Sequence, residues 1–248
     1  MSMFEAVDSN YREVVRALYY TEKATNRAIR ERSEAAASAL TKVQMLLVSI
    51  KAEAGLVRVL YLPNGIPGSI RTSVLAQATA LEKWKYAIDE CFRFHYSVPR
   101  RKTLEQALDH DVLAKRVTLL EIVQQELNSL ISIRNKLAHG QFVMPLNEDL
   151  TSVQVDALKA MAAETALSLK FKDNIAEQLT KALGDLVQSP KTFERLFRGR
   201  YAKIRDNREV LSTADYSAWV SSLRATRRSF PDLASEYITK FGFPEINT

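Results

Sequence analysis

The sequence predicts an all-α protein. Its 248 residues include only seven Gly and seven Pro, and long stretches without these residues favour helices over turn-rich β folds. Apolar residues make up 46% of the chain and charged residues 26%, which is typical of a protein with a sizeable core. Apolar side chains also recur at helical spacing along most of the chain. We therefore expect a bundle of long helices.

The first predicted helix runs from Phe4 to about Leu60. Apolar residues recur there at helical spacing, no Pro interrupts them, and no Gly occurs before Gly55. The pattern allows one very long helix, or two helices with a break near the polar stretch 31–34. A small bundle cannot cover such a length, so we expect part of it to pack against another chain or the C-terminal half.

Two further helices are expected after the loop at residues 62–68. One runs from about 72 to 96, with Trp84 and Ile88 on its core face, and ends before Pro99. A short helix should follow Thr103, because Thr with Gln three residues later is a capping-box pattern.

A third long helix is expected from about 111 to 139. Gly140 occupies the position that favours the left-handed conformation after a helix end, and residues 142–149 read as a loop around Pro145. The apolar stripe of this helix comprises Leu113, Leu120, Val123, Leu127, Leu130, Ile131 and Leu137.

The C-terminal part should contain shorter helices. Breakers separate the segments, which we expect at 151–171, 174–188, 191–198, 214–228 and 231–241. Residues 1–145 thus form the predicted long-helix bundle, and residues 146–248 a smaller, basic helical extension. The border lacks linker composition, so both can belong to one domain.

The third long helix ends with the sequence Arg134-Asn135-Lys136-Leu137-Ala138-His139. On a helical wheel, Arg134 lies in the middle of the apolar stripe. Its guanidinium must therefore be paired, line a cleft or face another subunit. A purely structural alternative is an ion pair with a carboxylate such as Glu53. Asn135 and His139, four residues apart, share a neighbouring face.

A cation, an amide and an imidazole suit cleavage of RNA. Histidine can take the proton from a 2′-hydroxyl or give one to the leaving oxygen near neutral pH. Arginine can bind the phosphate oxygens and stabilise the transition state. This chemistry requires no metal, and the three histidines share no short ligand spacing. No nucleotide-binding glycine loop is present. We expect neither a metal nor a cofactor.

The Arg-Asn-x-x-x-His pattern, late in a long amphipathic helix, resembles the signature of the HEPN superfamily. The resemblance implies a HEPN-like helical bundle and a metal-independent endoribonuclease, with Arg134 as phosphate ligand and His139 as general acid or base. Asn135 would orient these groups. It further implies a homodimer whose two motifs form one composite site, and a toxin or phage-defence role with an antitoxin or sensor partner.

One position departs from the pattern of some HEPN toxins. Where a nucleotidyltransferase antitoxin silences the toxin, a tyrosine follows the histidine by two positions, and here that residue is Gln141. That particular partner is therefore not implied. Two alternatives stay open: a catalytically silent adaptor that binds RNA, nucleotide or a protein, and a helical scaffold. In the scaffold, His139 would be a helix C-cap and Asn135 a structural amide.

Positive charge gathers in the C-terminal extension. The net charge is +6, and residues 191–228 hold ten Lys and Arg against four Asp and Glu, so they account for all of it. Such a segment suggests an anionic partner, although a solvated face is the alternative. Aromatic residues interleave with the basic ones that we predict to contact RNA, namely Arg195, Arg198, Arg200, Lys203 and Arg205.

The remaining features concern the cellular compartment. Cys91 is the single cysteine, so no intrachain disulfide can form and a reducing compartment is the simple interpretation. No apolar signal region follows the N-terminus, and no run of about 18 apolar residues suggests a membrane span. We expect a cytoplasmic protein without a membrane partner.

Overall fold

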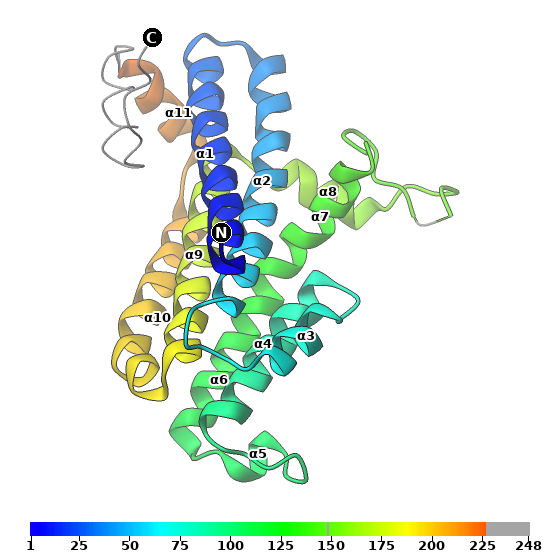
Figure 1. The fold of residues 1–248 in the computed structure, drawn as a ribbon. Helices are drawn as coiled ribbons and strands as arrows, with labels where there is room; N and C mark the ends of the chain where they lie inside the picture. The colour runs from blue at the N-terminus through cyan, green and yellow to red at the C-terminus, as the bar shows by residue number, and fades with distance from the viewer. Residues whose placement is uncertain (148, 227–248) are drawn as a thin grey trace.

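The structure is a computed structural model that describes residues 1–147 and 149–226 (Figure 1). Within these residues the chain is all-α, as the sequence predicts. The extended structure that occurs there is a single bridge between Leu146 and Val153. None of the described helices combines the length and the apolar composition that crossing a bilayer requires.

The first two helices form an antiparallel hairpin. Helix α1 spans Met3–Arg30 and α2 spans Glu34–Leu60, so of the two alternatives the break near residues 31–34 is correct. Arg32 adopts a φ of 57° in the turn between them. Helix α1 begins with a capping box in which the side chains of Ser2 and Glu5 bond each other's backbone N–H groups.

The predicted helix 72–96 is two helices. Helix α3 spans Gly68–Leu75 and α4 spans Ala80–His95. Thr79 ends the intervening turn and starts α4 through a capping box with Glu82. The short helix after Thr103 is confirmed as α5, Leu104–Ala107, with its own capping box.

The predicted helix 111–139 is continuous but not uniformly α-helical. Helix α6 spans His110–Ile122, a π-helical turn η1 spans Val123–Leu127, and α7 spans Asn128–Ala138. A π turn accommodates one more residue than an α turn. Helical-wheel angles therefore do not carry directly from α6 into α7.

Four helices complete the described chain. They are α8 Val155–Ala163, α9 Ala166–Gln188, α10 Pro190–Thr213 and α11 Tyr216–Ala225. The predicted breaks at Asp173-Asn174 and Gly199 are wrong, because α9 and α10 run through them. The actual break precedes Thr165, whose hydroxyl caps α9. The predicted helix 231–241 lies outside the described residues.

Helix α2 is buried over the part from Gln44 to Leu60, whereas residues 34–43 are exposed or partly exposed. It packs against α1, α9 and α7 (Figure 1). One cluster of buried apolar residues extends from Leu18 to Ile204, so it draws on both predicted regions. Trp84, Phe92 and Phe193 are fully buried within it. Phe92 lies four residues after Ile88, so its burial agrees with the core face predicted for this helix.

A buried cation joins α2 to α9. The Nζ atom of Lys51 lies 2.7 Å from Oδ2 of Asp173 and 3.3 Å from Oε2 of Glu177. Burial by itself would lower the pKa of the Lys51 ammonium, but the two carboxylates hold that pKa above its ordinary value. The crossing of the two helices is thus fixed by charge as well as by apolar packing.

Cys91 should be inert in the folded protein. Its side chain is fully buried, and burial raises the pKa of its thiol to about 12. Because the thiolate is the reactive species, we expect modification by a thiol reagent such as Ellman's reagent to be at least a hundredfold slower in buffer than in strong denaturant. Modification rates measured across a urea series test this. A native rate close to the unfolded one would contradict the described burial.

Candidate active site

The end of α7 is built as a Schellman motif. The N–H of Gln141 donates to the carbonyl of Lys136 at 3.0 Å, and the N–H of Gly140 donates to that of Leu137 at 3.0 Å. Gly140 has a φ of 76°, as predicted for the residue after the helix end. These bonds hold His139 at the C-cap of α7.

Arg134 forms an ion pair with Glu53 of α2, through its Nη2 atom and the Oε1 atom of the carboxylate. The side chains are 24% and 32% exposed, so the pair lies at the rim of the α2–α7 contact. Leu130, Ile133 and Leu137 are buried beside it. The contact with Glu53 that the sequence suggested is therefore present.

Part of the Arg134 guanidinium is without a partner. Its Nε atom is buried, and no hydrogen-bond acceptor within the described residues reaches it. Because the buried Nε is closed to solvent, an external acceptor can reach only the Nη groups of this guanidinium, one of which Glu53 holds. A phosphate would offer such acceptors.

Asn135 and His139 lie on the exposed side of α7. Within the described residues, the hydrogen bond between these two residues is a backbone one: the N–H of His139 donates to the carbonyl of Asn135 at 3.3 Å. Both side chains are open to solvent rather than packed in the core. The imidazole is therefore accessible to a ligand, about one and a half turns beyond Arg134.

Residues 141–147 and 149–154 belong to a largely exposed loop held to the end of α7. The Oε1 atom of Gln141 accepts from the N–H of Leu146 at 2.7 Å, and Nζ of Lys136 donates to the carbonyl of Leu146 at 2.5 Å. The loop predicted at 142–149 is longer than expected, because α8 starts only at Val155. Gln141 thus serves as a structural support at the position where some HEPN toxins carry a tyrosine.

The same loop and the first residue of α8 expose large apolar side chains that follow the motif in the sequence. We call this set the loop patch, and its members are Phe142, Val143, Met144, Leu150, Val153 and Val155. Their exposed fractions range from 38% to 67%. A contiguous exposed apolar surface indicates contact with another macromolecule. The loop composition gave no such signal in the sequence.

The structure separates the five predicted RNA contacts of α10. Arg195, Arg198 and Arg205 are exposed and share one helical face, within about 80° of one another at 100° per residue. Arg200 faces α9, where its Nε lies 3.0 Å from Asp185. Lys203 is also exposed, but it lies about 80° to the other side of Arg195 and therefore about 140–160° from Arg198 and Arg205. We call the three exposed arginines the α10 stripe.

The α10 stripe and the motif belong to different parts of the molecule. Helix α10 packs mainly on α9, whereas α7 packs on α2 and α8 (Figure 1). The two are connected near η1, where Nε of Arg208 lies 2.7 Å from Oε1 of Glu126. Aromatic rings interleave as predicted, and those of Phe197 and Tyr201 stack with centroids 6.2 Å apart.

Comparison with known proteins gives no independent identification. No protein-family model matches the chain, and no match was found among curated proteins or solved structures. Among the described residues, no three His, Cys, Asp or Glu side chains gather as a metal site would require. A function must therefore be inferred from the residues of the chain itself.

A double-mutant cycle should detect the Arg134–Glu53 pair. Each of Arg134→Gln and Glu53→Gln leaves a partly buried charge without its partner, so each should destabilise the protein by about 1 kcal/mol. Because both side chains are partly exposed, the coupling energy should be about 0.5–1 kcal/mol. Urea unfolding of the four proteins measures it.

The pair Arg27–Glu31 supplies the matched control. Its Nε–Oε1 distance is 2.7 Å, but its side chains are 77% and 56% exposed, so its coupling should be weaker than that of Arg134 and Glu53. Equal coupling energies in the two pairs would mean that the contact with Glu53 of α2 stabilises Arg134 no more than a fully exposed ion pair would.

Proposed function

We propose that this protein is a metal-independent endoribonuclease of the HEPN type. The observation that carries the proposal is the arrangement at the end of α7, where an accessible imidazole, His139, follows a partly exposed guanidinium, Arg134, that Glu53 anchors. The resemblance of the motif to the HEPN signature supplies the reaction class.

In the proposed reaction, one histidine removes the proton of the 2′-hydroxyl. The 2′-oxygen attacks the adjacent phosphorus, and the bond from phosphorus to the 5′-oxygen breaks. A second histidine protonates the leaving oxygen. The products are a 2′,3′-cyclic phosphate and a 5′-hydroxyl end. Arg134 binds the non-bridging oxygens and stabilises the additional negative charge of the transition state, and Asn135 orients the phosphate or the imidazole.

Glu53 acts as a positioning residue in this proposal. A guanidinium on a long flexible side chain loses conformational freedom when it binds phosphate, and a carboxylate that already holds it reduces that cost. The ion pair leaves other N–H groups of Arg134 for the substrate. The side chain of Glu53 itself need not touch RNA.

A homodimer would bring two such motifs together. The motif of one protomer supplies one histidine, His139, whereas the proposed reaction uses two, one as base and one as acid. The loop patch begins three residues after His139 and exposes the apolar surface that a subunit contact requires. We propose that a second copy covers part of this surface and contributes its own His139 and Arg134 to a composite site.

The proposed biological setting is phage defence or a toxin–antitoxin pair in the cytoplasm. Metal-independent cleavage of cellular RNA would need to be restrained between infections, and an antitoxin or sensor partner would provide that restraint. Gln141 supports the loop through Leu146, so a restraint that acts on a tyrosine at this position does not apply here.

A second candidate is a catalytically silent adaptor that binds RNA. The observation that favours it is the α10 stripe, whose arginines are exposed well away from the motif. In this alternative the Arg134–Glu53 pair is structural, and the stripe contacts the phosphate backbone. The two candidates differ in whether RNA is cleaved.

Cleavage of a mixed RNA pool in excess EDTA tests the proposed enzyme. We expect the wild type to release fragments with 2′,3′-cyclic phosphate ends, and His139→Ala and Arg134→Ala to reduce cleavage at least a hundredfold. The matched controls are His110→Ala, whose side chain is 96% exposed, and Arg101→Ala, on an exposed loop. Both should cleave like the wild type.

Two results would contradict the enzyme. The first is cleavage that survives His139→Ala, which would place the activity elsewhere or in a contaminant. The second is intact RNA that the wild type nevertheless retains in a gel-shift assay, which would favour the adaptor.

RNA affinity and its salt dependence test the α10 stripe. The double variant Arg198→Ala/Arg205→Ala should bind single-stranded RNA more weakly and lower the slope of log affinity against log salt by about 1.4, since each phosphate contact contributes about 0.7. Arg200→Ala, which breaks the contact with Asp185, should leave the slope unchanged. An unchanged slope in the double variant would show that the stripe is a solvated face.

A further inference from the structure

A row of aromatic rings leads from the core to the surface of α10. The ring of Phe193 is fully buried, and its centroid lies 5.5 Å from that of Phe92 and 5.1 Å from that of Phe197. The ring of Tyr201, one turn later, is parallel to that of Phe197, with an interplanar angle of 3°. Tyr201 is 39% exposed. The row therefore ends in a ring that is open to solvent but supported from the core.

Tyr201 lies between two arginines of the α10 stripe. Arg198 precedes it by three residues and Arg205 follows it by four, which are the spacings at which side chains of one helix are neighbours. At 100° per residue, both arginines lie within about 60° of Tyr201 around the helix, and they are about 10.5 Å apart along its axis. The exposed ring thus has a cation on each side.

The acidic residues along this part of α10 do not cancel these cations. Glu194 is engaged in an ion pair with a lysine of α6, and Glu209 lies two turns beyond the exposed ring. Asp206 pairs with Arg205, but both side chains are at least 60% exposed, and such a pair is weak enough for a phosphate to replace. Within the described residues, Arg198 has no carboxylate partner. Positive charge therefore prevails around the ring and favours an anionic ligand.

We infer that Tyr201 is a stacking platform for a base of single-stranded RNA, and that Arg198 and Arg205 bind the phosphates beside that base. Sites for single-stranded nucleic acid combine exposed aromatic rings with a basic surface, because every base offers a ring face for stacking. The inference rests on the RNA binding proposed for the α10 stripe, and it requires no cleavage at His139.

The packing of the aromatic row prepares Tyr201 for this role. A ring that Phe197 already supports loses little side-chain freedom when a base stacks on it, so less of the stacking energy is lost in ordering the site. Stacking depends on the bases, whereas the arginine contacts depend on the phosphates and on salt. The two contributions can therefore be measured separately.

Binding of a short, fluorescein-labelled 2′-O-methyl oligoadenylate, followed by fluorescence anisotropy, tests the inference. The 2′-O-methyl groups block the proposed cleavage, so the affinity is measured whether or not the protein is an enzyme. An abasic oligomer of the same length keeps the phosphates but offers no bases. We expect the wild type to bind the oligoadenylate about tenfold more tightly than the abasic oligomer, and Tyr201→Leu to remove this preference.

The companion variant Tyr201→Phe should bind like the wild type, because it keeps the ring. In Tyr201→Leu, the slope of log affinity against log salt should equal that of the wild type, because the substitution removes no charge. A lower slope in Tyr201→Leu would overturn the inference, since it would mean that the substitution disturbs the phosphate contacts instead.

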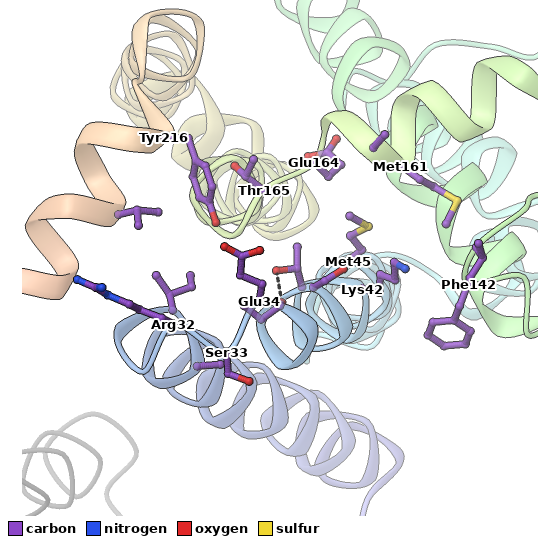
Figure 2. A pocket seen from close by; sticks show the side chains of 18 of the residues that line it. Arg32, Ser33, Glu34, Lys42, Met45, Phe142, Met161, Glu164, Thr165 and Tyr216 are labelled. Atoms are coloured by element: carbon purple, nitrogen blue, oxygen red, sulfur yellow. Dashed lines mark hydrogen bonds between the residues drawn. The ribbon is translucent and has the colours of Figure 1, made fainter.

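Tyr216→Leu is the matched control. Tyr216 is 38% exposed and its ring also stacks on an aromatic neighbour, Trp219. It lies away from the α10 stripe, at a cavity between α2, α8, α11 and the loop after α7 (Figure 2). This variant should keep the affinity and the base preference of the wild type, and circular dichroism should show the same helix content in all variants.

Three further results would overturn the inference while RNA binding by the α10 stripe stands. They are equal affinity of the wild type for the two oligomers, an unchanged base preference in Tyr201→Leu, and an equal loss in Tyr216→Leu. Absence of binding to both oligomers would overturn the inference and the stripe together, and the cleavage assay at the motif would still decide whether the protein is an enzyme.

Discussion

The burial of α2 is the constraint on which the rest of the structure depends. This helix carries apolar residues around most of its circumference, so it must be covered on several sides at once. Helices α1, α9 and α7 provide that cover. The few charged side chains of α2 are consequently either paired at a crossing, as Lys51 is with Asp173, or placed at a rim or an opening, as Glu53, Glu34 and Lys42 are.

This arrangement explains the character of the proposed active site. Helix α7 contributes the whole motif, but α2 provides the carboxylate that fixes Arg134. The loop after α7 is fastened by Gln141 and Lys136, which leaves His139 exposed at a rigid helix end. The anchored cation and the accessible imidazole thus come from two different environments, one at a helix crossing and one in solvent.

The sequence predicted the helical class and the end of α7 at Gly140, because periodicity and local conformation determine them. It gave the break near residues 31–34 only as one of two alternatives. It failed where local signals compete with tertiary packing. Gly199 lies within α10 with open space beside its Cα, so the helix continues past it. The capping box at Thr79 is surrounded by good helix formers, so the periodicity of the segment did not predict a helix start there. The helical wheel shows that Arg134 requires a partner, but it does not identify that partner, which lies 81 residues away in the sequence. The cavity between α2, α8, α11 and the loop after α7 depends on how these four elements pack, which the periodicity of each one does not reveal.

The contacts of Lys51 with Asp173 and of Glu53 with Arg134 fix the rotation of α2 about its axis, and this has an evolutionary consequence. Inserting or deleting one residue within this helix would rotate everything beyond it by about 100°, and would displace Lys51 from Asp173 and Glu53 from Arg134 together. Homologous chains should therefore keep a constant length between Glu34 and Glu53, even where their side chains differ.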